Sequence, residues 1–484
     1  SDVCSSDLVP DFPMKTSPLF LVLALLAPWT ARAAAAAPEA TVGWDSLPAI
    51  LARIKAPQFP VKDFPVTDYG AKGDGTTDCT EAIAKAIAAC NAAGGGRVVV
   101  TGGVFLTGAV HLKSNVNLHV AAGATLKFSP DPKKFLPVVR ARYEGTEFMN
   151  YSPLIYAYQQ ENIAITGQGT LDGSATRDTW WGLSANRPAG APALLGSTQL
   201  IAMGDQNVPV EQRIFGDKGS LRPNFIVPYL CRNVLIEGVS IINSPMWEVN
   251  PVLCTNVTVR GLNINSHGPN NDGCDPDSCR DVLIEDCVFD TGDDCIAIKS
   301  GKNADGRRVN VPSENIVIRN CVMKDGHGGV VMGSENAGGV RNVFAENCRM
   351  DSANLQRALR LKTNSLRGGF HENVFFRNIT IGRVSDSILT IDLVYENNTD
   401  GPYAPRVRNV LMENITATSA PRVLSVVGTA KSTIENVRIR NSQFSGVEGA
   451  DRLANSGSVT YENVTIQAAP RPRATAAPAT APKE

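Results

Sequence analysis

A short motif of the form Asn-Val-x-Ile recurs along most of the chain and constrains its fold more than any other feature. Each copy combines an opening Asn or Asp with alternating apolar residues, which is typical of a turn followed by a short β-strand. The motif starts at Asn162, Asn233, Asn256, Asp281, Asn315, Asn342, Asn373, Asn409, Asn436 and Asn463. From Asn233 onward, successive starts lie between 23 residues (Asn233 to Asn256) and 36 residues (Asn373 to Asn409) apart. A period of this size, built from short strands, is the signature of a solenoid.

The apolar residues of the repeat indicate which solenoid it forms. They are mainly Val and Ile, whereas a leucine-rich repeat needs recurring leucines. We therefore predict an all-β fold, a right-handed, single-stranded parallel β-helix in which each coil adds a strand to each of several parallel sheets. In this fold the recurring Asn residues of successive coils stack and can form a ladder of side-chain hydrogen bonds.

The sequence on either side of the repeats predicts how the β-helix begins and ends. Residues 66–105 follow the order strand, Gly-rich turn, helix, strand, so the helix is expected to cap the N-terminal end of the apolar core. The predicted organisation is a doubtful leader (1–13), a signal peptide (14–36), an N-terminal segment leading into the domain (37–65), the parallel β-helix domain (66–467) and a flexible tail (468–484).

The predicted signal peptide implies that the protein is exported. Lys15 provides the positive start, residues 19–27 the apolar stretch, and residues 31–33 an Ala-x-Ala cleavage site. A membrane anchor would need a longer apolar run. We expect a secreted or periplasmic protein that has no contact with the membrane once the signal is removed.

Charge and cysteine content narrow the expected partners and cofactors. The chain has 46 basic and 47 acidic residues, so its total charge gives no reason to expect nucleic acid or an anionic membrane as a partner. Apart from Cys4 in the leader, the cysteines would enter a compartment where disulfides form. Disulfides such as Cys274–Cys279 and a stack of small interior side chains are both compatible with the spacing. No paired C-x-x-C motif occurs, and we expect a monomer without a metal or organic cofactor.

Three acidic residues, a histidine and two basic residues recur at intervals of about one coil. They are Asp272, Asp293, Asp294, His327, Arg360 and Lys362. The steps from Asp272 to Asp293, from Asp294 to His327 and from His327 to Arg360 are 21, 33 and 33 residues. Residues one coil apart stack at about 4.8 Å, the spacing between strands, so these side chains are expected to line one groove.

Each of these residues has an ordinary structural explanation when it is considered alone. Gly-Asp-Asp is a common turn, a single histidine usually has no chemical role, and two basic residues on a strand form a solvated surface. Their joint position along one side of a solenoid favours a groove with three carboxylates at its centre. Three neighbouring anions repel, so the pKa of one carboxyl group is expected to rise. A cationic His327 would oppose that rise, so activity is expected at mildly acidic pH.

Four short motifs resemble those of the polygalacturonases, glycoside hydrolase family 28, whose fold is the pectin-lyase-like solenoid. They are N-N-D-G at 270–273, G-D-D at 292–294, G-H-G at 326–328 and R-L-K at 360–362, within a likeness that extends over about residues 66–467. The resemblance implies hydrolysis of α-1,4-linked galacturonic acid in pectin with inversion at the anomeric carbon.

The resemblance also implies a role for each matching residue. Asp293 matches the general acid, and Asp272 and Asp294 match the pair that activates water. His327 matches the histidine that supports the acid or orients the sugar. The implied substrate-binding residues are Arg360, Lys362 and Asn270. Asn271 departs from the family, which commonly has Thr at this position.

Within this family the chain is similar to the bacterial exo-polygalacturonases. The similarity lies in an insertion at 179–228 and in residues 301–316. Long loops in compact proteins are usually functional, and a wall that closes one end of the groove would make cleavage proceed from the chain end. Arg307 and Arg308 are candidates for binding the terminal carboxylate, and the alternative is that they are ordinary loop charges.

Other functions are compatible with a β-helix. They are hydrolysis of rhamnogalacturonan or another pectin backbone, carbohydrate binding without catalysis, and the pectate lyase reaction. A lyase would need a carboxylate-bound calcium ion and an arginine base, and its unsaturated products would absorb ultraviolet light. The four motifs together favour hydrolysis over these alternatives.

Overall fold

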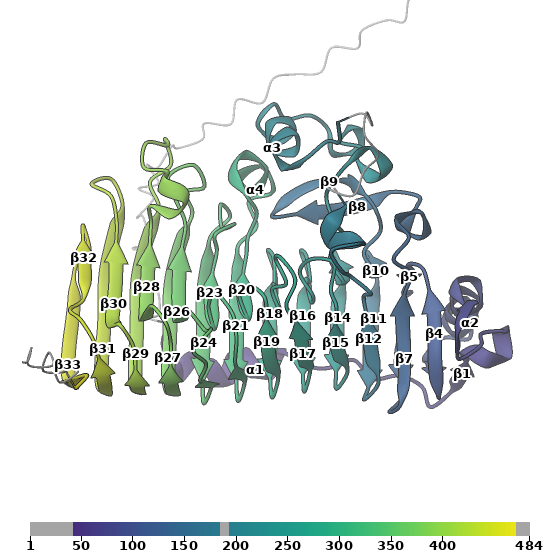
Figure 1. The fold of residues 1–484 in the computed structure, drawn as a ribbon, viewed down its shortest axis with the longest axis horizontal. Coiled ribbons are helices and arrows are strands. Elements are labelled where there is room, and N and C mark those ends of the chain that lie inside the picture. Colours follow the sequence, from purple (N-terminus) through teal and green to yellow (C-terminus); the bar gives the residue numbers. More distant parts are fainter. Residues whose placement is uncertain (1–41, 184–192, 471–484) are drawn as a thin grey trace, which may run out of the picture. The chain divides into compact units, whose positions relative to one another are not determined.

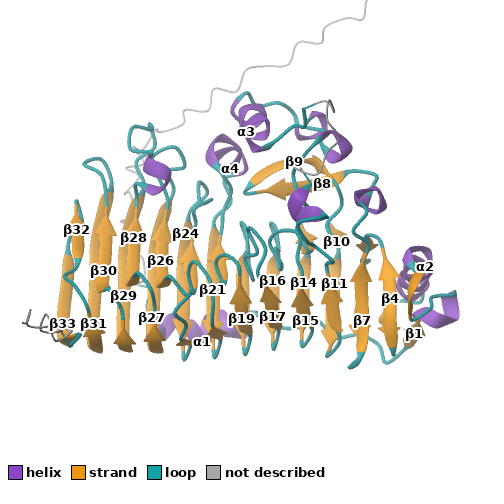
Figure 2. Ribbon diagram, in the orientation of Figure 1, coloured by secondary structure: helices purple, strands orange, loops and turns teal. Residues whose placement is uncertain are grey.

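The computed structural model describes residues 42–183 and 193–470, which form a right-handed, all-β parallel β-helix (Figure 1). This confirms the predicted fold class. The predicted leader (1–13), the signal peptide (14–36) and the tail after residue 470 lie outside the described residues. Strands are the main regular structure of the domain, and a few short helices lie outside them (Figure 2). No helix in the described part of the chain is long and apolar enough to cross a membrane.

Successive coils contribute parallel strands to three rows. The first row contains β1 (Asp63–Pro65), β3 (Gly96–Val100), β6 (Val116–Val120), β11 (Glu161–Gly167), β14 (Arg232–Glu237), β16 (Thr255–Arg260), β18 (Arg280–Glu285), β21 (Ser313–Arg319), β24 (Val340–Glu346), β27 (Phe370–Arg383), β29 (Arg406–Ser419), β31 (Thr433–Val447) and β33 (Val459–Ala468). The second row contains β2 (Asp74–Asp78), β4 (Gly103–Thr107), β7 (Ala124–Phe128), β12 (Thr170–Asp172), β15 (Ser240–Ile242), β17 (Asn263–Ser266), β19 (Val288–Thr291), β22 (Val322–Met323) and β25 (Arg349–Met350), and it joins the first row at β27.

The third row carries part of the site described below. It contains β5 (Val110–His111), β10 (Ile155–Tyr158), β13 (Ile226–Tyr229), β20 (Ile296–Ile298), β23 (Val330–Met332), β26 (Arg357–Lys362), β28 (Ser387–Asp392), β30 (Arg422–Val427) and β32 (Arg452–Ala454). Outside the rows, β8 (Val139–Tyr143) and β9 (Thr146–Asn150) form an antiparallel hairpin. The α-helices are α1 (Leu47–Arg53), α2 (Thr80–Ala92), α3 (Ser197–Asp205) and α4 (Asn303–Val309).

The apolar residues of the repeat form columns inside the coils. From Asn233 to Asn436, the Val or Ile that follows the opening Asn or Asp is buried and pairs in register with its equivalent on the next coil. One such column consists of Val234, Val257, Val282, Ile316, Val343, Val374, Val410 and Val437. Because burying one such side chain contributes about 1.5–3 kcal/mol, a column of this length fixes the register of successive coils.

The opening Asn residues form the predicted ladder at the start of each first-row strand. Asn342 donates from Nδ2 to Oδ1 of Asn315 at 3.0 Å, and it accepts from Asn373 at 3.0 Å. The backbone of Asn342 has a φ of 58°, in the left-handed region. Asn and Asp adopt this region more readily than most residues, so both the backbone and the side chain explain why Asn recurs here.

The ladder is interrupted at Asp281, and the N-terminal segment joins the site of the break. A carboxylate cannot donate the amide hydrogen bond that Asn256 would otherwise accept. Instead, Oδ1 of Asn256 accepts from the backbone N–H of Lys55 at 2.8 Å. Oδ1 of Asp281 accepts from Arg53 at 2.8 Å. The single acidic member of the ladder therefore anchors the segment that precedes the β-helix.

Helix α1 packs on the outside of the β-helix, which the composition of residues 37–65 did not predict. Leu47, Ile50 and Ile54 bury their side chains against outward-facing apolar residues of the first row. These partners are Leu283, Val317, Phe344, Phe375 and Leu411. The segment thus spans several coils and protects an apolar stripe from water.

Helix α2 covers the N-terminal end of the core, as predicted. Its buried face consists of Ala82, Ile83, Ala86, Ile87 and Cys90. These side chains are part of the same apolar cluster as the interior of the first coils. The helix therefore removes from water the open end that the first coil would otherwise expose.

The cysteines of the described residues are free thiols in the interior and form no disulfides. Of the two explanations that the spacing allowed, the stack of small interior side chains is therefore the right one. The thiol of Cys279 accepts from the backbone N–H of Cys254 on the neighbouring coil at 3.4 Å, and the thiol of Cys287 accepts from Leu262 at 3.4 Å. Thiols thus occupy turn positions where a small, weakly polar side chain can lie between coils.

Replacement of Asn342 tests the two roles of the ladder. Asn342→Ala removes two ladder hydrogen bonds, worth about 0.5–1.5 kcal/mol each, and leaves a residue with a Cβ in the left-handed region. Asn342→Gly removes the same bonds but relieves the backbone strain. We expect the urea midpoint of unfolding to decrease in the order wild type, Asn342→Gly, Asn342→Ala. An alanine variant as stable as the glycine variant would contradict the strain argument.

Candidate active site

The predicted catalytic residues lie close together on neighbouring coils in the middle of the β-helix. Asp272 lies in the loop after β17, Asp293 and Asp294 follow β19, and His327 lies between β22 and β23. The basic pair Arg360 and Lys362 lies on β26. Apart from Asp294, which is fully buried, these residues line a cavity of about 440 Å³. That volume is typical of ligand pockets, which range from about 300 to 1,000 Å³.

The three aspartates are within reach of one another. One oxygen of each of Asp272, Asp293 and Asp294 lies within 4.8 Å of the others. Asp272 and Asp294 are buried, whereas the side chain of Asp293 is 18% exposed. Asp272 and Asp294 each have a buried Oδ1 atom without a hydrogen-bond partner among the described residues. Asp272 and Asp293 therefore face the cavity, and the two buried acids, Asp272 and Asp294, hold unused acceptor atoms.

Asp293 and His327 form a hydrogen-bonded pair. The Nδ1 atom of His327 lies 2.9 Å from Oδ1 of Asp293. Burial works to raise the pKa of Asp293, but the hydrogen bond from His327 and the charge of Lys362 outweigh it, so the net pKa is lowered. The same hydrogen bond raises the pKa of His327 against the opposing effect of its burial. The pair therefore retains a proton on the histidine at pH values above the usual histidine pKa of about 6.5.

Asp294 lies next to the basic residues of β26. The Nζ atom of Lys362 donates to Oδ2 of Asp294 at 2.7 Å, and Arg360 approaches Oδ1 to 4.0 Å. Both cations also lie near the ring of Tyr395, at 5.3 Å for Lys362 and 5.5 Å for Arg360. The Nε atom of Arg360 is buried and has no partner among the described residues. This part of the cavity thus presents positive charge that Asp294 only partly compensates.

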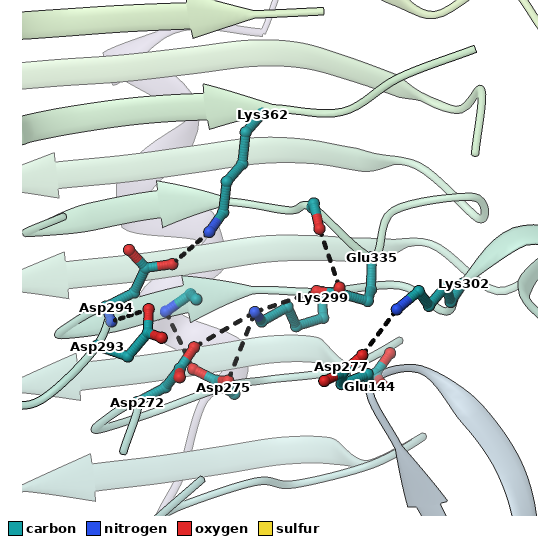
Figure 3. A network of polar contacts seen from close by, with 12 residues as sticks. Glu144, Asp272, Asp275, Asp277, Asp293, Asp294, Lys299, Lys302, Glu335 and Lys362 are labelled. Carbon is teal, nitrogen blue, oxygen red and sulfur yellow. Dashed lines mark hydrogen bonds and ion pairs between the residues drawn. The ribbon is translucent and has the colours of Figure 1, made fainter. Parts of the chain in front are cut away.

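A second group of charged residues lies beside Asp272 and consists of Asp275, Lys299 and Glu335 (Figure 3). The sequence did not identify these residues as part of the site. Burial, together with the charges of Asp275 and Asp293, raises the pKa of Asp272 well above the usual range, although Lys299 opposes the rise. Burial is also the main reason that the pKa of Asp275 rises to about 8. Glu335 belongs to the same group, and its pKa lies below the usual range because the charges of Lys299 and other cations outweigh its burial.

Several other cavity residues were also missed. They are Glu144, Trp247, Ser334, Glu335, Gln356, Arg357, Tyr395 and Glu396. Most of them lie in loops outside the repeated motif, so no periodic signal identifies them. Arg357 was closest to detection because it lies on the same strand as the R-L-K motif.

The two asparagines of the first motif differ in role: one lines the cavity and the other is structural. Asn270 lines the cavity, and its Oδ1 atom accepts from Arg222 at 2.8 Å. Asn271, the position at which the chain departs from the resembled family, is fully buried. Its amide accepts from Gly268 at 2.8 Å and donates to the carbonyl groups of Ser244 and Met246 at 3.1 Å. Asn271 therefore shapes the loop that carries Asp272 and has no contact with the cavity.

Arg307 and Arg308 do not line the cavity. Arg308 forms ion pairs with Glu147 and with Asp305, the latter at 3.0 Å. Arg307 donates to the carbonyl oxygen of Leu366 at 2.9 Å. Both side chains are engaged in contacts that hold α4 and its surroundings together, and we do not include them among the substrate-binding residues.

The described residues of the predicted insertion, 179–183 and 193–228, pack with the β8–β9 hairpin and α4 (Figure 1). Leu200 and Phe215 of the insertion join Phe148 of the hairpin in a small apolar core. Buried ion pairs add to this packing. Arg142 pairs with Asp277 at 2.7 Å, and Arg213 pairs with Asp305 at 2.8 Å.

The tip of the hairpin reaches the cavity. Glu144, between β8 and β9, lines the cavity and pairs with Lys302 at 2.7 Å. In Figure 3, Glu144 and Lys302 lie on the opposite side of Lys299 from Asp293 and Asp294. The hairpin, held by buried ion pairs, therefore forms a wall at the side of the cavity away from Asp293.

The spacing of the three aspartates alone would also suit a cation. However, Lys362 and Lys299 already supply positive charge to Asp294 and Asp272. A divalent ion at this position would have to coexist with two buried ammonium groups, which is electrostatically unfavourable. We therefore assign no metal ligands here.

Two family models match the chain. The model described as "Glycosyl hydrolases family 28" matches residues 210–471, and the model described as "Rhamnogalacturonase A/epimerase, pectate lyase-like" matches residues 64–186. The first covers more than half of the chain and contains all six residues predicted to act on the substrate at the centre of the groove.

Individual relatives agree with the family model. The chain is similar to the solved structure of a hyperthermoactive exopolygalacturonase from Thermotoga maritima, with 46% identity, a TM-score of 0.83, and coverage of 87% of this chain and 96% of that one. It is 28% identical to the exo-poly-alpha-D-galacturonosidase of Dickeya chrysanthemi over 83% of this chain and 70% of the relative. It is 29% identical to a probable polygalacturonase of Vitis vinifera over 72% of this chain and 66% of the relative. The chain therefore belongs to the glycosyl hydrolases of family 28.

Proposed function

We propose that the protein hydrolyses α-1,4-galacturonosidic bonds of pectin or polygalacturonate with inversion and that it acts from the chain end. One observation carries the proposal. Three aspartates with oxygens within 4.8 Å of one another lie beside a cavity that also contains His327, Arg360 and Lys362. Relatives named as an exopolygalacturonase and an exo-poly-alpha-D-galacturonosidase support the substrate and the exo action.

Asp293 is the proposed proton donor to the leaving oxygen. In the free protein the proton rests on His327, whose hydrogen bond with Asp293 keeps the carboxylate ionised. A bound sugar displaces water from Asp293, and this desolvation raises the carboxyl pKa. The proton then moves from His327 to Asp293 and on to the glycosidic oxygen as the bond to the anomeric carbon breaks. His327 thus supplies the proton that a carboxylate with a lowered pKa does not hold by itself.

Asp272 and Asp294 are the proposed pair that holds and activates water. Each has a buried Oδ1 atom without a partner among the described residues, and these atoms can accept hydrogen bonds from one water molecule. As the water oxygen attacks the anomeric carbon, one carboxylate of the pair takes its proton. The reaction therefore adds one water across the bond, with the proton of Asp293 on the leaving sugar.

Arg360 and Lys362 are the proposed binders of a galacturonate carboxylate. A guanidinium and an ammonium group on one strand suit an anionic sugar, and Tyr395 supplies an aromatic face beside them. Asn270 at the rim of the cavity is a further substrate-binding residue. These groups provide local positive charge that the balanced total charge of the chain conceals.

The hairpin wall supports action from the chain end. A groove that is open on both sides lets a polymer pass through, whereas the tip at Glu144 occupies one side of the cavity. Buried ion pairs such as Arg142–Asp277 keep this wall from moving aside.

Three alternative functions are kept. The match of residues 64–186 to a rhamnogalacturonase-type model favours rhamnogalacturonan or another pectin backbone as a second candidate substrate. A β-helix that binds carbohydrate without turnover would retain the cavity but would not need paired acids, and a pectate lyase would release unsaturated products. The predicted signal peptide at 14–36 further implies that the protein is secreted or periplasmic. We also propose that it is a monomer and that its substrate is a pectic polysaccharide.

Asp293→Asn tests the proposed reaction. The amide keeps the shape of the side chain but cannot donate the proton, so we expect the release of reducing ends from polygalacturonate to fall by about 10²-fold or more. Ultraviolet absorbance from unsaturated products should be absent for both proteins. Asp290→Asn is the matched control, because Asp290 contacts His267 at 3.1 Å and does not line the cavity. Equal activity of Asp293→Asn and wild type would refute the assignment.

A shortened hairpin tests the exo proposal. Arg142 and Glu147 are paired in the hairpin, so Tyr143–Thr146 can be replaced by Asn-Gly, a preferred two-residue turn. This change removes Glu144 but keeps the ion pairs of Arg142 and Glu147. We expect a larger fall in the viscosity of polygalacturonate per reducing end released, because longer chains can then pass the cavity.

Two comparisons control the hairpin experiment. Glu144→Gln keeps the length of the hairpin and should retain the products of the wild-type protein. If the shortened hairpin also gives the wild-type ratio of viscosity loss to reducing ends, the wall does not determine where the polymer is cut.

A further inference from the structure

Lys299 is a buried lysine at the floor of the cavity, at the end of the third-row strand β20. Its side chain is 3% exposed. The Nζ atom lies 3.4 Å from Asp272, 3.2 Å from Glu335 and 3.7 Å from Asp275 (Figure 3). It also lies 4.5 Å from the centre of the Trp247 ring. One ammonium group therefore contacts three carboxyl groups, two from the loop between β17 and β18 and one from the loop after β23.

The surroundings of Asp272 are strongly acidic. The carboxyl cluster around Lys299 consists of Asp272, Asp275 and Glu335. The charged and titratable groups that face this cluster are Glu248 from the preceding coil, Asp293 and Asp294 from the turn after β19, Lys302 before α4, Lys362 from β26, and Arg367 from the loop after β26. Glu248 and Asp275 are fully buried and retain carboxyl oxygens without hydrogen-bond partners among the described residues. The one ion pair of Asp272 in the described part of the chain is with Lys299.

We infer that Lys299 is a positioning residue: it compensates the charge of this carboxyl cluster and so opposes the protonation of Asp272, which must be a carboxylate to take a proton from water. The inference rests on the proposed hydrolysis and adds a residue to it. Without an ammonium group at this point, Asp272 and Asp275 would be left with no ion-pair partner in the described part of the chain, whereas Glu335 would keep Arg367 at 3.9 Å. Such a cluster binds protons, and a protonated Asp272 cannot act as a base.

The rival role for Lys299 is direct binding of a sugar carboxylate, because the residue also lines the cavity. The two roles predict different kinetics. A substrate-binding lysine affects KM at every pH. A lysine that acts through Asp272 changes the pH at which the reaction loses its base, which is the acidic limb of the kcat/KM profile.

Lys299→Met is the first test, with polygalacturonate as substrate. Removal of the positive charge disfavours the ionised carboxylates, so their pKa rises and a higher pH is needed to form the base. We expect the acidic limb of kcat/KM to move to higher pH by about one unit or more, as is typical for loss of an opposite charge at this distance. The double variant Lys299→Met/Asp275→Asn removes one of the competing carboxylates and should move the limb back toward wild type.

Glu335→Gln provides an independent test that retains Lys299. Loss of the Glu335 charge leaves Lys299 with two carboxylates to compensate, so the acidic limb should move to lower pH, opposite to the effect of Lys299→Met. The Glu335→Gln variant tests the proposed role of Lys299 even if Lys299→Met does not fold. Lys324→Met, which removes an exposed lysine outside the cavity, should leave the profile unchanged.

The outcomes separate this inference from the proposed function. If the wild-type protein does not cleave polygalacturonate, the proposed function fails in the same assay, before any variant is compared. If the wild-type protein is active, an unchanged acidic limb in Lys299→Met, or an increase in KM alone, would overturn the role of Lys299. A shift of Glu335→Gln to higher pH would also overturn it.

Discussion

The structure depends on the in-register stacking of successive coils. Each coil adds strands whose residues lie directly above their equivalents, so a distance of about thirty residues in the sequence becomes one inter-strand spacing in space. His327 and Asp293 are 34 residues apart in the chain and 2.9 Å apart in the structure. Lys362 and Asp294 are 68 residues apart, two coils, and lie within 2.7 Å. The catalytic cluster is thus a consequence of register, which the columns of Val and Ile and the Asn ladder maintain.

A rigid frame also explains how so many charges can be buried together. Asp272, Asp275 and Lys299 have almost no access to water, and such groups are stable only when their partners are held in place. Asp272 and Asp275 lie in the loop between β17 and β18, which is bridged to β20 at Cys274 and Ile296, and β20, directly before Lys299, pairs with β23. The stability of the whole β-helix therefore offsets the unfavourable free energy of their mutual repulsion. The acids acquire perturbed pKa values that suit proton transfer.

Much of the fold and the centre of the site could be predicted because both are periodic. The repeat predicted the parallel β-helix, the Asn ladder and the order of Asp272, Asp293, His327 and Arg360 along one side. The features that were missed depend on contacts without a local signal. Helix α1 is a short apolar segment whose partners are distributed over the outer faces of several strands, and Glu335 and Tyr395 reach the cavity from irregular loops.

The residues predicted by resemblance rather than by period fared less well. Arg307 and Arg308 lie in the expected segment, but the path of α4 directs them to Glu147, Asp305 and backbone carbonyl groups instead of the cavity. A loop can retain its sequence likeness while its charges hold the wall together. The path of such a loop is determined by packing against other loops, which a single sequence does not specify.

The most direct test of the account is the configuration of the first product. The oxygens of the three aspartates lie within 4.8 Å of one another, whereas the carboxyl groups of most inverting glycosidases are about 6.5–9.5 Å apart and those of retaining enzymes about 5–5.5 Å. We predict that proton NMR, recorded during the first minutes of hydrolysis of an oligogalacturonate, will show the β anomer first, because Asp272 and Asp294 hold water on the face opposite to the leaving group. Initial release of the α anomer would mean that an aspartate attacks the sugar directly, and it would contradict the roles assigned to all three acids.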